Sequence, residues 1–169
     1  MIISIPSVVI LSALFISLWG GSIRFTTPML FALAFLPMFG IGGLTGLYLA
    51  TTAVDVHVHD TYFVVAHFHV VMGLSAVMAM FGGVYHWFPK MFGRMMNKKL
   101  GYAHFWLTFV SAYGVFFPMH FTGLAGVPRR YYTNSEFALF DNMVGLNELI
   151  SLFAILGALA QFIFFFNFF

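Results

Sequence analysis

Five long apolar stretches determine what this chain can fold into. They cover residues 1–19, 27–50, 62–88, 100–124 and 140–169. Each approaches or exceeds the ~20 residues that an α-helix needs to cross a bilayer. An open sheet cannot cross, because its backbone polar groups would lie unsatisfied in lipid, and barrel strands would give short alternating runs. The pattern therefore predicts an all-α fold, a polytopic transmembrane helix bundle of about five spans that forms one region over residues 1–169.

The composition excludes several classes of protein. Hydrophobic residues make up 62% of the chain and charged residues only 7%, whereas a soluble domain carries about 25% charged residues. There is no cysteine, which excludes disulfides, thiolate metal sites and iron–sulfur clusters within this chain. A net charge of +2 is too small to indicate a nucleic-acid partner. The expected surroundings are membrane lipid and other membrane-embedded helices.

The charges of the loops predict an orientation. The loop between the third and fourth stretches holds most of the basic residues, namely Lys90, Arg94, Lys98 and Lys99. Positive loops stay on the cytoplasmic or matrix side, and Arg24, between the first two stretches, falls on the same side. Arg129 and Arg130 then lie on the outer side, against this tendency. They are either a solvated or lipid-phosphate pair, or a clamp for buried anionic groups, which suit the guanidinium fork.

Two histidines, His67 and His69, fall inside the third apolar stretch. Imidazoles are costly in hydrocarbon unless they have a function there. A helix turns by about 100° per residue, so these two side chains point to nearly opposite faces. A single metal ion is poorly placed to bind both, because chelating pairs on a helix are three or four residues apart. One interpretation is a helix between two cofactors, with one axial imidazole for each; the other is a polar pair that lines a water cavity or bonds neighbouring helices.

A second polar group occupies the loop before this stretch, and it comprises Asp55, His57, His59 and Asp60. Carboxylate and imidazole ligands together suit a divalent cation such as Mg²⁺, Mn²⁺ or Zn²⁺. Two ligands are too few for a complete site, so water or another subunit would have to contribute. The alternative is an ordinary polar loop at the membrane interface.

The other polar and aromatic features have simpler interpretations. His86 and His104 are expected at the membrane interface, and His120 near the outer end of its span. Each is expected to be a hydrogen-bonded packing residue rather than a ligand. The phenylalanine-rich tail, 162–169, is expected to face lipid, and the glycine-rich patch at 40–46 suits close helix packing.

The string HDTYFVVAHFH at residues 59–69 resembles the signature of the haem–copper oxidase catalytic subunit, cytochrome c oxidase subunit I. The resemblance continues in chain order through MIISIP at 1–6, GGLTG at 42–46, GVYHWFP at 83–89, FFPMHF at 116–121 and GVPRRY at 126–131. It covers essentially the whole chain and implies the last five helices of a twelve-helix subunit, its carboxyl-terminal third.

The resemblance implies a role for each matched residue. His67 matches the proximal ligand of the high-spin haem that binds oxygen, His69 matches an axial ligand of the low-spin haem, and Phe68 lies between the two haems. His59 and Asp60 match a Mg²⁺/Mn²⁺ site completed by water and the second subunit.

In the family, residues on the outer side of the membrane bind the propionate groups of the haems. The resemblance implies that Arg129 and Arg130 hold the haem propionates and that Asp55 lies near them. The haems are expected to be of the a type. The copper ligands, the tyrosine cross-linked to one of them and the other low-spin haem ligand belong to earlier helices of the family. Copper is therefore expected to bind outside this chain, which cannot reduce oxygen without the missing helices.

One position departs from the family. The common members carry an intramembrane lysine three residues after the hydroxyl of an Ile-Pro-Thr/Ser motif. Here Ser7 keeps the hydroxyl, but Ile10 stands where the lysine is expected. The usual lysine proton pathway is therefore in doubt, and Ser7 is left to order a water chain.

Together these features predict part of a respiratory terminal oxidase that reduces O₂ to water with coupled proton translocation. The expected partners are the remainder of subunit I, oxidase subunits II and III, and cytochrome c or an equivalent donor. The expected location is an energy-transducing inner membrane, the bacterial plasma membrane in preference to the mitochondrial one. The alternatives are a quinol-oxidizing relative, a non-catalytic haem-binding or assembly fragment, and a cofactor-free transporter.

Overall fold

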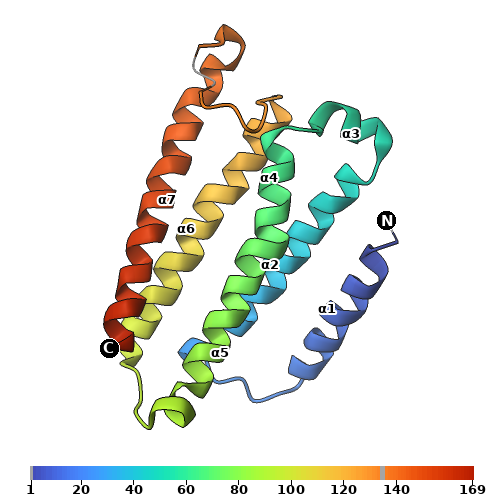
Figure 1. The fold of residues 1–169 in the computed structure, drawn as a ribbon. Helices are drawn as coiled ribbons and strands as arrows, with labels where there is room; N and C mark the ends of the chain where they lie inside the picture. Colours follow the sequence, from blue (N-terminus) through green and yellow to red (C-terminus); the bar gives the residue numbers. More distant parts are fainter. Residues whose placement is uncertain (1, 134–135) are drawn as a thin grey trace.

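The computed structural model describes residues 2–133 and 136–169, and Met1 of the first predicted span lies outside the described residues. Helices run through all five predicted stretches (Figure 1). The helical elements are α1 (Ser4–Leu18), α2 (Thr27–Leu49), α3 (Thr52–Val58), α4 (Tyr62–Phe68), α5 (Ser75–Phe92), α6 (Lys98–Leu124) and α7 (Asp141–Phe168). Two short segments join them, the π-helical η1 (His69–Leu74) and the 3₁₀ turn η2 (Ala138–Phe140). The predicted all-α class is confirmed.

Four helices are long and apolar enough to cross a membrane: 27–49, 62–92, 98–124 and 138–168. The second of these is one continuous helix made of α4, η1 and α5. The remaining stretch forms α1, which has 15 residues and is shorter than the ~20 that a span needs. Against the expectation of about five spans, the described residues thus form four helices of full spanning length and one shorter apolar helix.

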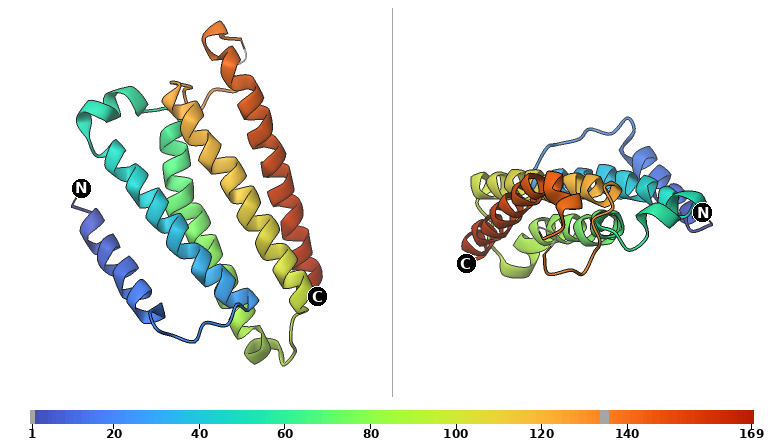
Figure 2. Two further views of the ribbon diagram at one scale, coloured as in Figure 1. Left: turned by 180° about the vertical axis from the view of Figure 1, so that it is seen from behind. Right: turned by 90° about the horizontal axis from the view of Figure 1, so that it is seen from above.

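The four long helices pack side by side, and Figure 2 shows the same arrangement from behind and from above. Helix α7 packs on α6, α2 packs on η1 and α5, and α4 packs on α6. Among the described elements, α1 contacts only α2, and Figure 1 shows it beside the bundle. Helix α1 therefore has most of its side chains exposed in this chain.

The described loops lie at the two ends of the bundle (Figure 1). The α1–α2 and α5–α6 loops, which contain Arg24 and Arg94, meet at one end of the bundle (Figure 1). Helix α5 ends at Gly93, whose φ of +68° requires the left-handed conformation that glycine tolerates. The Asn97 side chain then accepts hydrogen bonds from Lys99 and Leu100 and begins α6.

The core lies where α2, α5 and α6 meet. Phe31 of α2 is fully buried, and its ring meets Phe105 edge-on at 5.0 Å and stacks on Tyr85 at 5.7 Å. His104 is also fully buried, and its Nδ1 lies 3.1 Å from the Tyr85 hydroxyl. The expectation that His104 is a hydrogen-bonded packing residue is confirmed, because Tyr85 and Gln161 (3.3 Å) are polar partners of its ring between the helices.

The phenylalanine-rich tail is only partly lipid-facing. Phe162 and Phe166 are exposed, as expected. Phe164, however, packs its ring on Phe81 at 4.9 Å, and Phe168 packs on Phe88 at 5.3 Å. The expectation for the whole tail is wrong, because a helix alternates its faces and α7 presents one of them to α5 and α6.

Candidate functional site

The His67 imidazole faces α2. Its Nδ1 lies 2.8 Å from the Gly42 carbonyl oxygen and 3.0 Å from the Thr45 hydroxyl oxygen. The Thr45 hydroxyl itself donates to the Gly42 carbonyl at 2.7 Å. Gly46 supplies room for the ring, since a Cβ at this position would lie 2.8 Å from the His67 Cε1 atom. The glycine-rich patch of α2 therefore fixes the position of this imidazole.

The His69 imidazole faces α6. Its Nδ1 lies 2.8 Å from the Val65 carbonyl oxygen of its own helix, and its ring stacks on Phe116 of α6 at 4.7 Å with an interplanar angle of 14°. Phe68, between the two histidines in sequence, is exposed and lies with its ring 4.4 Å from that of His69. The two histidines thus contact different helices.

The hydrogen bonds decide which nitrogen of each ring carries a proton. A backbone carbonyl can only accept, so the Nδ1 atoms of His67 and His69 must donate to Gly42 and Val65. The Nε2 atom of each neutral ring then holds a free lone pair. This tautomer, fixed by a carbonyl on the other nitrogen, is the one that metal-ligating histidines use. Both residues therefore fit an axial ligand of a haem iron.

A cavity of about 510 Å³ adjoins His67. It lies between α1 and α2, and apart from His67 its polar side chains are Ser4 and Ser7; most of the rest are aliphatic residues and glycines. This volume falls within the ~300–1,000 Å³ of pockets for cofactors and small molecules. Its apolar walls and single imidazole suit a flat apolar macrocycle. Ser7, which the sequence marked, lies on this wall, and Ile10 is exposed.

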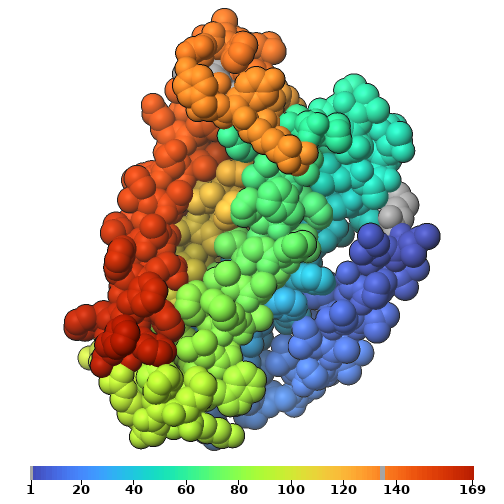
Figure 3. Space-filling view, viewed as in Figure 1, coloured from blue at the N-terminus to red at the C-terminus, as the bar shows by residue number. Residues whose placement is uncertain are grey.

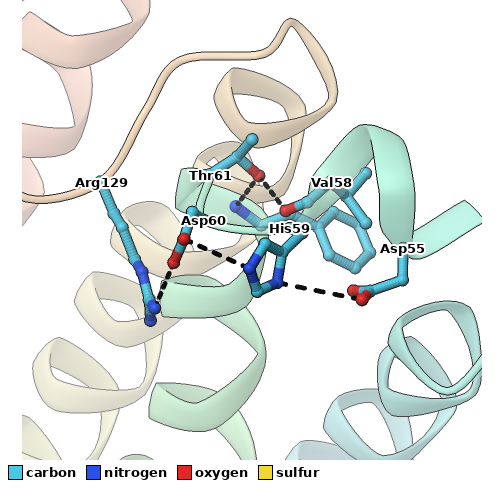
Figure 4. A network of polar contacts seen from close by, with 7 residues as sticks. Asp55, Val58, His59, Asp60, Thr61 and Arg129 are labelled. Carbon is cyan, nitrogen blue, oxygen red and sulfur yellow. Dashed lines mark hydrogen bonds and ion pairs between the residues drawn. The ribbon is translucent and has the colours of Figure 1, made fainter.

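A polar network joins the loop between α3 and α4 to the loop that follows α6 (Figure 4). His59 Nε2 lies 3.2 Å from the Asp60 carboxylate and His59 Nδ1 lies 3.9 Å from that of Asp55. Asp60 also forms an ion pair with the Arg129 guanidinium, and the Arg129 backbone N–H donates to the Asp60 carbonyl at 2.9 Å. Asp60 has a φ of +56°, a conformation that aspartate tolerates better than most residues. The structure thus brings Asp55, His59, Asp60 and Arg129 together.

The Arg129 guanidinium, by a side-chain hydrogen bond, holds the pKa of Asp60 below its usual value. The positive charges of Arg129, His59 and Arg130 add to this effect, and partial desolvation opposes it. Asp60 is therefore a carboxylate at neutral pH, which is the form that binds cations. The Arg129 Nε atom is buried without a hydrogen-bond partner among the described residues, so this donor remains for an acceptor such as a carboxylate.

Two sequence candidates stay outside this network. The side chains of His57 and Arg130 are exposed. In the described part of the chain, no three His, Cys, Asp or Glu side chains converge as a metal site would require. A cation at His59 and Asp60 would thus need other ligands, as the sequence predicted.

The local sequence explains how the network is held in place. The Thr61 hydroxyl donates to the Val58 carbonyl at 2.6 Å and accepts from the Phe63 N–H at 3.2 Å, which caps α4. The Tyr62 N–H donates to the Val127 carbonyl at 3.0 Å. These bonds tie the start of the continuous α4–η1–α5 helix, and so His67 and His69, to the loop that holds Arg129.

Sequence reasoning missed the residues that orient His67. Gly42 and Thr45 lie in a patch that the sequence marked only for helix packing, and nothing in its letters shows that a carbonyl faces an imidazole 25 positions later. It expected His120 to be a hydrogen-bonded packing residue, but did not anticipate that the Nε2 atom of this ring is buried and unpaired among the described residues. That nitrogen is the acceptor of its ring, because Nδ1 donates to the Phe116 carbonyl at 2.8 Å.

Fold and site define a helical membrane protein with two ligand-type histidines on one helix. The family described as "Cytochrome C and Quinol oxidase polypeptide I" matches residues 1–156. The chain belongs to this family, the subunit I family of haem–copper oxidases.

The similarity to individual proteins agrees with this family assignment. The chain is 49% identical over 168 residues to the alternative cytochrome c oxidase subunit 1 of Bradyrhizobium diazoefficiens, covering 99% of this chain and 28% of the relative. It is 50% identical over 133 residues to cytochrome c oxidase subunit 1 of Bacillus sp. strain PS3, covering 79% and 22%. A cryo-EM structure of a heme-copper terminal oxidase dimer matches with a TM-score of 0.73 and 25% identity, over 84% of this chain and 26% of that one. The chain therefore spans less than a third of the length of these relatives.

Proposed function

We propose that this chain supplies one axial imidazole to each of two haems in a respiratory terminal oxidase. His67 is the ligand of the high-spin haem at which O₂ is reduced, and His69 is a ligand of the low-spin haem. The observation that carries the proposal is the arrangement of the two imidazole rings. Each ring donates its Nδ1–H to a backbone carbonyl, and the two rings contact different helices.

The chain's own residues orient and shield these ligands. Gly42 and Thr45 hold the His67 ring from α2, while Phe116 holds the His69 ring from α6. Most of the wall around His67 consists of aliphatic residues and glycines, which would give the cofactor an apolar environment. When bound, the haems would supply electron transfer and oxygen chemistry, with potentials set by the ligand nitrogens and the dryness of the site. We expect haems of the a type, with Phe68 between them.

On the outer face, His59 and Asp60 are the proposed ligands of a Mg²⁺ or Mn²⁺ ion, completed by water and a partner subunit. Arg129 and Arg130 are the proposed partners of the haem propionates, and Asp55 lies near them. The buried, unpaired Arg129 Nε atom supports this assignment because it leaves a donor for a second carboxylate.

The complete enzyme requires more than this chain. Copper is proposed to bind on the remainder of subunit I, which assembles with subunits II and III. The proposed electron donor is cytochrome c, and proton translocation across an energy-transducing membrane, the bacterial plasma membrane, accompanies oxygen reduction. The family description also includes quinol oxidases, so a quinol donor is the alternative. Turnover of the purified complex with reduced cytochrome c but not with quinol supports the first donor.

Visible spectra of the assembled complex test the two-haem proposal. His67→Ala should abolish ligand binding at the high-spin haem and oxygen reduction, and His69→Ala should remove the low-spin signal. His86→Ala is the matched control, since His86 is an exposed histidine of the same long helix. Identical spectral losses in the first two variants, or an equal loss in the control, would refute the proposal.

Manganese tests the outer site. Cells grown in manganese should give a complex with an EPR signal from bound Mn²⁺, and Asp60→Ala should remove that signal while both haem spectra persist. A signal of equal strength in the variant would refute the assignment.

A further inference from the structure

The charges of this chain are divided between the two ends of the bundle. The carboxylates all belong to the outer loops or to the outer half of α7, and they are Asp55, Asp60, Glu136, Asp141 and Glu148. The opposite end, which we call the inner end, carries five of the seven basic residues: Arg24, Lys90, Arg94, Lys98 and Lys99. Figure 3 shows the blue α1–α2 loop and the yellow-green α5–α6 loop at this end, and the teal and orange outer loops at the other. No carboxylate of the chain therefore lies near the inner cations.

Two contacts hold the start of α6 against the α1–α2 loop. The Tyr102 hydroxyl of α6 donates to the Phe25 carbonyl of that loop at 2.8 Å. One residue earlier, Gly101 lies against Thr27, the first residue of α2, since a Cβ at Gly101 would be 2.8 Å from the Thr27 Oγ1 atom. Arg24, which directly precedes Phe25, is therefore brought to the first turns of α6.

Two lysines share the face of α6 that Tyr102 occupies. Lys98 and Lys99 precede Tyr102 by four and three residues, and residues at these spacings are neighbours on a helix surface. Together with Arg24 they form a group that we call the inner cationic cluster. All three residues are exposed, and the ion pairs among the described residues lie at the outer end. Like charges on adjoining segments repel one another, so an anion from outside this chain would stabilise the cluster.

The other two inner cations differ from the cluster. The Arg94 guanidinium donates from Nη1 to the Phe169 carbonyl at 2.9 Å, so it caps the end of α7. Lys90 belongs to the last turn of α5 and is exposed. Lys90 is therefore an exposed lysine of the same end with which the cluster lysines can be compared.

The length of α6 places the cluster at the level of lipid headgroups. Its 27 residues make a helix of about 40 Å, whereas the hydrocarbon core is about 30 Å thick. The first turn of α6 therefore reaches into the headgroup layer. Trp106 and Val110 follow Lys99 by seven and eleven residues, which puts them on the same face, and they are 54% and 51% exposed. The face that carries the cations thus continues as an exposed apolar surface toward the bilayer centre.

We infer that the inner cationic cluster binds the phosphate group of an anionic phospholipid from the inner leaflet. The cytoplasmic leaflet is negatively charged and attracts basic residues close to its surface, and guanidinium and ammonium groups both bind phosphate. Arg24, Lys98 and Lys99 hold the phosphate, and an acyl chain lies along Trp106 and Val110. The inference goes beyond the proposed function and does not depend on the haem ligands.

Lysine modification in the assembled complex tests the site locally. The complex is placed in phosphatidylcholine nanodiscs with increasing fractions of phosphatidylglycerol, and the extent of reaction with an amine reagent is measured at each lysine by mass spectrometry. Phosphatidylglycerol should protect Lys98 and Lys99 at a lower fraction than it protects Lys90. Inorganic phosphate added to phosphatidylcholine nanodiscs should give no protection, because it has no acyl chain to lie along α6.

Two variants separate the site from the net charge of the surface. Each cation near an anionic surface contributes about fivefold in affinity, so Arg24→Gln should raise the phosphatidylglycerol fraction needed for half protection by about that factor. Lys90→Gln removes the same charge outside the cluster and is its control. Tyr102→Phe keeps every charge but frees the α1–α2 loop, so it should also weaken protection. Tyr48→Phe, at an exposed tyrosine of α2, is the control for the lost hydroxyl.

The same measurements contain the results that would overturn the inference. Equal protection of Lys90, Lys98 and Lys99, or an Arg24→Gln variant that behaves like Lys90→Gln, would show a general effect of surface charge. Protection by inorganic phosphate alone would show a site for a free anion. Cluster lysines that resist modification without phosphatidylglycerol would show that another part of the complex, such as an acidic protein segment, covers them.

Discussion

Replacing Gly123 with alanine tests the closest approach between α4 and α6. A Cβ at Gly123 would lie 2.0 Å from the backbone nitrogen of Phe63 and 2.5 Å from its Cα. Ordinary contacts of a Cβ begin at 3.4 Å, so α4 would have to move by roughly 1 Å or more. A backbone cannot swing aside as a side-chain tip can, and interiors are too densely packed to absorb such a shift.

The expected cost follows from two opposing effects. Overpacking a well-packed interior costs about 1–3 kcal/mol, and the rigid contact puts Gly123→Ala at the upper end of that range. Alanine favours a helix over glycine by about 1 kcal/mol. The net destabilisation is therefore about 2 kcal/mol, a factor of roughly 30 in the folding equilibrium.

Thermal unfolding of the assembled complex in detergent measures this effect. Gly145→Ala is the control, because Gly145 lies on an exposed face of α7 and a Cβ there meets nothing within 4 Å. The control should keep or slightly raise the unfolding temperature, while Gly123→Ala should lower it. Equal unfolding temperatures for the two variants would refute the close approach.

Three further changes probe the sites. Because the lowered pKa of Asp60 favours its charged form in the folded state, its stabilising effect is fully present above the ordinary value of about 3.9. That effect is lost as the pH falls through the lower folded value. The drop in unfolding temperature at acid pH should therefore be smaller in Asp60→Asn than in the wild type. An equal drop in both would refute this. Thr45→Val removes one partner of His67 Nδ1, at about 1 kcal/mol, and should shift the spectrum of the high-spin haem; an unshifted spectrum would leave Gly42 as the sole orienting group. Ser7→Ala should slow reduction of the high-spin haem in stopped-flow experiments if Ser7 orders a proton-carrying water chain, whereas an unchanged rate removes α1 from the proton path.

The sequence was enough to predict the membrane helices and the opposite directions of the two histidine side chains. A continuous apolar run determines its own state, because an isolated segment in lipid must satisfy its backbone hydrogen bonds internally and only a helix does so. The directions of His67 and His69 also follow from the local helical period, which needs no knowledge of the neighbours.

What surrounds those histidines depended on the tertiary structure. The Gly42 carbonyl next to His67, the Arg129 partner of Asp60 and the burial of His104 all join helices or loops far apart in the chain. Such contacts depend on how each helix is rotated about its axis and shifted along it against its neighbour. Both quantities are determined jointly by the side chains along the whole length of the two helices. The apolar pattern is too uniform to specify them, since almost every face of these helices is hydrophobic and the sequence alone does not tell which one meets lipid, protein or a cofactor.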